Sequence, residues 1–261
     1  MTTLSTACLL LFAASGLGAA DSPFTGTWKL DMTKSDFSGE TIRFQTGKAN
    51  MVRYTGAGET YTFTTDGQPH PGLFGRLVSV KQMDANTWVR TTEFKGKVLS
   101  EATLSLSADG NTLTETSKGT RPDGSLFENV EVYDRVGEGY GVVSGMLGIW
   151  RSKSARESSA TVLEFGDNGP DGIAFILRQI SGKCLLKFNG KDYPATGPTV
   201  PEGLTLAATR IGERSFELTE KIKGKAIYKA TYSVSDDGKS LLEMGSPVRV
   251  VERTKSVYLR Q

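Results

Sequence analysis

The chain has few of the residues that most often bind metals or carry catalysis. It contains one histidine, His70, and two cysteines, of which Cys8 lies in an apolar N-terminal stretch and Cys184 in a strand-like run. A structural zinc site needs four ligands and a disulfide framework needs paired cysteines, so the sequence predicts no metal and no cofactor. It also lacks a Gly-x-Ser-x-Gly turn that would present a nucleophilic serine. We therefore expect no catalytic residue, with His70 in a solvated loop and Cys184 as a small buried hydrophobe.

Runs of like charge are missing as well. The 31 basic and 29 acidic residues give a net charge of +2 and are interleaved along the chain. Without a basic patch, binding to nucleic acid is not expected.

The apolar run within residues 1–20 is too short to span a bilayer as a helix, which takes about 20 consecutive apolar residues. It is uncharged and ends in small residues, which is typical of a secretory signal peptide cleaved near Ala20. We expect a secreted or periplasmic protein without stable membrane insertion.

Helical periodicity is a further absence. Apolar residues instead alternate with polar ones in short segments such as residues 59–65, and turn signals such as Asp66-Gly67 separate these segments. The 30 glycines fit a chain with many tight hairpins, which need positive φ angles. Residues 68–75 contain two prolines and cannot form a central strand. The sequence predicts an all-β protein with little helix and nine or ten strands in its first half.

The chain also repeats itself. Gly26–Leu30 (GTWKL) returns as residues 148–152 (GIWRS), and Asp66-Gly67 returns as Asn189-Gly190. Residues 107–110 (SADG) match residues 235–238 (SDDG), and residues 130–135 (VEVYDR) match residues 248–253 (VRVVER). Several matches in the same order favour an internal duplication.

An antiparallel sheet of this size has two open edges, and closure into a barrel removes both. The sequence therefore predicts two tandem up-and-down antiparallel β-barrels. The expected organisation is a signal peptide at 1–20, a first barrel at 21–137, a linker at 138–146 and a second barrel at 147–261.

Residues 24–37 (FTGTWKLDMTKSDF) resemble the opening of secreted bacterial lipocalin-like (calycin) domains, and residues 191–197 resemble a segment common in those proteins. The resemblance implies barrels that are closed at one end and bind small apolar molecules inside. It also implies that the first-strand tryptophans, Trp28 and Trp150, plug the closed ends. Arg135 and Arg253 are then the last-strand arginines that would pack across them as cation–π partners.

Aromatic residues at strand spacing are the ligand-binding candidates. They are Tyr61, Phe63, Trp88 and Phe94 in the first half and Phe175, Phe188, Phe216 and Tyr232 in the second. Packing of a filled core is the alternative role for all of them. Arg90 joins them because it shares a strand face with Trp88 and would meet the carboxylate of an acidic apolar ligand if that face points inward. The aligned residue in the second half is Leu218.

These features predict a non-catalytic binding protein that holds a small apolar or amphipathic molecule inside a barrel. A structural or protein-interaction module with filled cores, acting through loops such as residues 118–126, is the first alternative. An enzyme that uses carboxylates or tyrosines is the second.

Overall fold

The structure is a computed structural model that describes residues 22–37, 40–49, 51–56, 59–72, 75–121, 124–137, 145–157, 161–248 and 253–261. The expected signal peptide, and residues 138–144 of the expected linker, lie outside the described residues.

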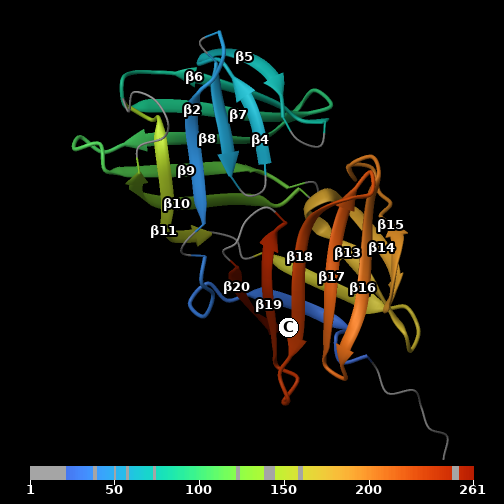
Figure 1. The fold of residues 1–261 in the computed structure, drawn as a ribbon. Helices are drawn as coiled ribbons and strands as arrows, with labels where there is room; N and C mark the ends of the chain where they lie inside the picture. Colours follow the sequence, from blue (N-terminus) through green and yellow to red (C-terminus); the bar gives the residue numbers. More distant parts are fainter. Residues whose placement is uncertain are drawn as a thin grey trace, which may run out of the picture.

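The described chain forms two ten-stranded antiparallel sheets (Figure 1). The two edge strands of each sheet contact one another, so each sheet curls into a nearly closed barrel. This confirms the predicted all-β fold with two barrels.

We call the sheet that contains β2 to β11 barrel 1, and the sheet that contains β1 and β12 to β20 barrel 2. The strands of barrel 1 are β2 (Thr41–Thr46), β3 (Val52–Gly56), β4 (Glu59–Phe63), β5 (Asp66–Pro71), β6 (Leu77–Gln82), β7 (Thr87–Phe94), β8 (Lys97–Leu106), β9 (Thr112–Thr120), β10 (Leu126–Gly137) and β11 (Gly148–Glu157). The strands of barrel 2 are β1 (Gly26–Leu30), β12 (Val162–Asp167), β13 (Gly172–Leu177), β14 (Gly182–Lys187), β15 (Asn189–Pro194), β16 (Leu204–Gly212), β17 (Ser215–Ile222), β18 (Lys225–Val234), β19 (Ser240–Pro247) and β20 (Thr254–Arg260). A short 3₁₀ turn, Arg178–Ile180, follows β13.

The first strand of each repeat lies in the other repeat's barrel. β1 pairs with β12 and β20 and therefore belongs to barrel 2, where its blue ribbon stands out among the later strands in Figure 1. β11 pairs with β10 and β2 and completes barrel 1. Sheet membership thus corrects the predicted division at 137 and 147. The predicted linker, 138–146, falls between β10 and β11, which are two strands of one barrel, and the chain changes barrel between β1 and β2 and between β11 and β12.

Local turn chemistry explains much of the meander. The hairpins β7–β8 and β17–β18 turn at Lys95-Gly96 and Lys223-Gly224, where all four residues have positive φ angles between 49° and 77°. Two consecutive positive φ angles define the type I′ turn, whose twist suits antiparallel strands. The proline-containing strand β5 lies at the edge of barrel 1. Proline has no N–H to donate to a neighbouring strand, so it is tolerated at the edge of a sheet and not in its centre.

Each barrel buries a tryptophan beneath an arginine. In barrel 1 the Arg135 guanidinium lies 4.1 Å from the Trp150 ring and donates hydrogen bonds to the carbonyls of Gly110, Gly145 and Leu147. The Trp150 indole N–H donates to the Met146 carbonyl. One arginine therefore ties the tryptophan strand to two neighbouring turns.

Barrel 2 repeats this arrangement with Arg260, which lies 4.1 Å from the Trp28 ring. Arg260 donates to the carbonyls of Pro23, Thr25 and Gly238. The sequence-based choice of Arg253 is corrected, because Arg253 is exposed and precedes β20. The true counterpart of Arg135 lies seven residues later, at the end of the closing strand.

Candidate functional site

The interior of barrel 1 contains an ion pair. Arg90 projects from β7 and its Nη2 donates to Oε1 of Glu115 on β9 at 2.5 Å. The two side chains keep 19% and 13% of their surface exposed. Burial alone would lower the pKa of Arg90, but the facing Glu115 carboxylate raises it, so the guanidinium stays charged. The structure thus places Arg90 on the inward face beside Trp88, with a carboxylate as its partner.

Further polar groups surround this ion pair. The Tyr133 hydroxyl donates to Oε2 of Glu131, and both residues belong to β10. Burial raises the pKa of Glu131, the nearby Glu115 and Glu40 raise it further, and the Tyr133 hydrogen bond and Arg90 lower it. Burial likewise raises the pKa of Glu40. The Glu115 and Glu131 carboxyl groups therefore both interact with the Arg90 guanidinium, and Glu40 interacts with Glu131.

Aromatic rings enclose the same region. The Tyr54 and Tyr61 rings lie 4.9 Å apart, and Trp88 meets Phe63 edge-on at 6.0 Å. Phe63 and Trp88 are buried, whereas Tyr61 is half-buried against the core. Tyr54, Tyr61 and Tyr133 also add to the field at Arg90. The structure thus brings together four of the five candidates of the first half: Tyr61, Phe63, Trp88 and Arg90.

The remaining candidate, Phe94, lies apart from this group. It stands at the end of β7, where Lys95 Nζ approaches its ring centroid to 5.2 Å. Phe94 is half-buried and is not among the core residues of barrel 1.

The candidates of the second half fill a core. Phe175, Phe216 and Tyr232 are buried, and the Phe216 and Tyr232 rings stack at 5.0 Å. The Phe188 and Phe216 ring centroids lie 5.2 Å apart, and the Arg210 guanidinium lies 4.4 Å from the Phe188 ring centroid. Ring contacts thus join Phe175 to Tyr232, Tyr232 to Phe216 and Phe216 to Phe188 in one continuous chain.

Barrel 2 has its own buried acidic group, which sequence reasoning missed. Glu243 on β19 accepts hydrogen bonds from the Tyr228 and Tyr258 hydroxyls, each at 2.8 Å. On β17, burial and the nearby Glu243 raise the pKa of Glu220 to about 7. The sequence signal was available, because Glu243 corresponds to Glu115 in the repeat and Leu218 to Arg90. Barrel 2 therefore has a glutamate at the position of Glu115 but no arginine at the position of Arg90.

The two residues singled out for nucleophilic or acid–base chemistry take structural roles. Cys184 is fully buried on β14, and burial raises the pKa of its thiol to about 11, which confirms the predicted buried hydrophobe. His70 is half-buried on β5, where its Nε2 accepts a hydrogen bond from the Thr64 N–H at 3.2 Å. It is thus held by a neighbouring turn and is less exposed than the sequence suggested.

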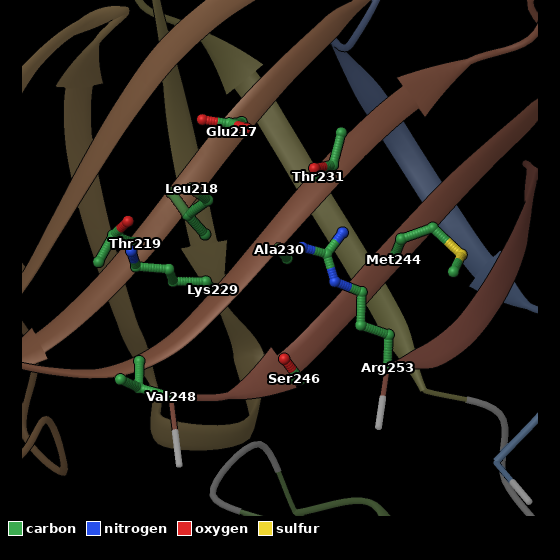
Figure 2. A pocket seen from close by; sticks show the side chains of 10 residues that line it. All are labelled: Glu217, Leu218, Thr219, Lys229, Ala230, Thr231, Met244, Ser246, Val248 and Arg253. Atoms are coloured by element: carbon green, nitrogen blue, oxygen red, sulfur yellow. The ribbon is translucent and has the colours of Figure 1, made fainter. Parts of the chain in front are cut away.

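A pocket of about 340 Å³ lies over β17, β18 and β19 of barrel 2 (Figure 2). It is lined by Glu217, Leu218, Thr219, Lys229, Ala230, Thr231, Met244, Ser246, Val248 and Arg253. Its exposed residues alternate along the strands with buried ones such as Leu218 and Ala230, so the pocket opens on the outside of the barrel.

In the part of the chain that the structure describes, no three His, Cys, Asp or Glu side chains lie together in a way that could hold a metal ion. Within the same residues, no helix is long and apolar enough to span a membrane.

Comparison of the chain with protein-family models, curated proteins and solved structures finds no match. The geometry of the two barrels therefore carries the functional argument alone.

Proposed function

We propose that the protein is a non-catalytic, secreted or periplasmic binding protein that holds a small amphipathic molecule inside barrel 1. The carrying observation is the partly exposed ion pair of Arg90 and Glu115 among the aromatic side chains of that barrel. Ligand pockets typically combine apolar walls with a few placed polar groups. A lipocalin-like barrel, which the opening residues 24–37 resemble, would use its interior in this way.

The charges favour a ligand with an uncharged polar head. Glu115 already balances Arg90, and burial raises the pKa of the neighbouring Glu131, which favours its neutral form. An anionic or cationic head would bring an unpaired charge into a poorly solvated space, which costs free energy. A hydroxyl or amide head would exchange hydrogen bonds with Arg90, Glu115 and Tyr133 at a smaller cost.

The test combines native mass spectrometry after gentle purification with displacement of a solvatochromic dye. The informative variant carries Arg90→Leu and Glu115→Gln together, since leucine is the residue of the second repeat and both members of the ion pair are removed. We expect this variant to bind the dye at least about tenfold more weakly. The matched control is Leu218→Met in barrel 2, which should leave binding unchanged. Equal binding by the double variant and the parent would place the site elsewhere.

Barrel 2 supports a second, structural role. Its aromatic candidates are buried and packed against each other, as expected of a filled core. We propose that barrel 2 acts as a scaffold or interaction module rather than as an interior binding site. A dye that binds the parent but not the Arg90 and Glu115 double variant would agree with this division of roles.

A further inference from the structure

The outer pocket of barrel 2 gathers positive charge and hydroxyl groups. Lys229 on β18 and Arg253 before β20 line it together with Thr219, Thr231 and Ser246. In Figure 2 the Arg253 side chain reaches across the strands toward Thr231, and the Lys229 side chain extends toward Thr219. The one carboxylate of the lining, Glu217, projects near Thr231 at the far side of the pocket from Ser246.

Neither cation of this pocket forms an ion pair with a described carboxylate. The ion pairs of barrel 2 among the described residues join Arg178 to Glu164, Lys221 to Asp192 and Lys223 to Glu202. Lys229 and Arg253 take part in none of them. Two positive charges therefore face a concave surface that also offers hydroxyl donors.

The internal repeat provides a comparison within the same molecule. Lys229 stands opposite Ser246 in the β18–β19 ladder, and the corresponding pair in barrel 1 is Glu101 opposite Lys118. In barrel 1 these two residues form an ion pair at 3.6 Å across β8 and β9. Barrel 2 has lysine in place of that glutamate and serine in place of that lysine. The same surface position thus holds an ion pair in barrel 1 and an unpaired lysine in barrel 2.

We propose that this pocket binds the phosphate or sulfate group of a small organic ester. Guanidinium, ammonium and hydroxyl donors match the several acceptor oxygens of a tetrahedral oxyanion. The volume of about 340 Å³ is at the lower end for ligand pockets and exceeds what a bare ion needs. Met244 and Val248 supply an apolar wall for the carbon skeleton of the ester. The pocket is independent of the interior of barrel 1, so it goes beyond the function proposed above.

Isothermal titration calorimetry at about 0.15 M salt tests the proposal, because weak nonspecific attraction to surface charges is screened there. The probes are glycerol 3-phosphate, inorganic phosphate, inorganic sulfate and glycerol. We expect the ester to bind most tightly, the bare ions more weakly and glycerol not at all.

Three variants locate the site. Arg253→Gln should weaken binding of glycerol 3-phosphate at least tenfold, and Lys229→Glu combined with Ser246→Lys, which recreates the ion pair of barrel 1, should abolish it. The control Lys187→Gln removes an exposed lysine from β14 and should change nothing. Equal loss in the control, unchanged binding in the pocket variants or no binding of any oxyanion by the parent would overturn the proposal. Circular dichroism melting of each variant confirms that loss of binding is not loss of fold.

Discussion

Trp28 and Cys184 lie far apart in the sequence but in the same barrel, and this makes a single-residue test possible. Trp28 is fully buried on β1, and Cys184 is fully buried on β14 of the same core. Trp28→Ala should lower the free energy of unfolding by about 3–5 kcal/mol, the usual cost of removing a buried aromatic ring. We expect the loss to appear in barrel 2, measured as faster reaction of Cys184 with a thiol reagent.

Trp150→Ala is the matched control for that experiment. Trp150 is buried to the same extent in barrel 1, so its removal should destabilise barrel 1 and leave Cys184 protected. If Trp150→Ala exposes the thiol and Trp28→Ala does not, then each tryptophan strand belongs to its own half and the observed strand pairing is refuted.

Glu220 provides a pH-dependent test at the same scale. Burial and the nearby Glu243 raise its pKa from an ordinary value of 4.5 to about 7. The Glu220 charge in turn helps to raise the pKa of the Tyr228 and Tyr232 hydroxyls. Between pH 4.5 and 7 the native state holds a proton that the unfolded chain has released. Stability should therefore fall as the pH rises through this window and stay low above it.

Glu220→Gln removes this titration while keeping the shape of the side chain. The variant should be more stable than the parent at pH 8, by up to about 3 kcal/mol, and the difference should vanish near pH 4.5. Urea denaturation at a series of pH values measures it. Glu217→Gln, three positions earlier and exposed, is the control. A difference between Glu220→Gln and the parent that does not change with pH would show that Glu220 titrates normally.

At the scale of elements, the sequence predicts individual strands and hairpins but does not predict which barrel each strand joins. The alternation of apolar and polar residues indicated the strands, and the many glycines indicated tight hairpins, because each of these depends on a few neighbouring residues. The strand exchange was not predictable, since GTWKL and GIWRS suit either barrel equally well.

The choice of Arg253 failed for a similar reason. Residues 248–253 match residues 130–135 in amino-acid sequence, but the closing strand of barrel 2 is residues 254–260. There Tyr258 and Arg260 occupy the places of Tyr133 and Arg135. Likewise, predicting the ion pair of Arg90 and Glu115 requires knowing how β7 and β9 are aligned in the sheet, and no pattern within a single strand gives this alignment.

Strand β19 contains a close approach that depends on glycine. A Cβ atom at Gly245 would overlap the Tyr228 hydroxyl, which donates to Glu243. Gly245→Ala should therefore push the tyrosine aside and leave one carboxylate oxygen of Glu243 without its donor. We expect a loss of about 1–3 kcal/mol in unfolding free energy from overpacking, measured by urea denaturation.

Gly137→Ala is the control for Gly245→Ala. The nearest atom to a Cβ at Gly137 is Ile149 Cδ1 at 3.5 Å, an ordinary contact, so the change should stay within about 0.5 kcal/mol. Equal effects of the two substitutions would mean that the Tyr228 contact contributes nothing specific.

For the whole molecule, the exchanged strands imply that the two halves hold each other together. Residues 1–137 contribute β1 to barrel 2, and residues 148–261 contribute β11 to barrel 1. Separation would pull β1 from between β12 and β20 and expose Trp28, and it would also pull β11 from between β10 and β2 and expose Trp150. Each exposed aromatic side chain costs about 1.5–3 kcal/mol in transfer free energy alone, in addition to the lost strand pairing.

A protease site inserted within residues 138–144 tests this mutual dependence. After complete cleavage the two fragments should still elute as one species on size-exclusion chromatography and separate only in denaturant. A second site within residues 158–160 is the comparison, because cutting there leaves barrel 1 continuous and only β1 linking the fragments. That species should also stay together, but it should dissociate at a lower urea concentration, since one exchanged strand resists separation less than two. Free elution of two folded fragments after the first cut would show that each half completes its own barrel.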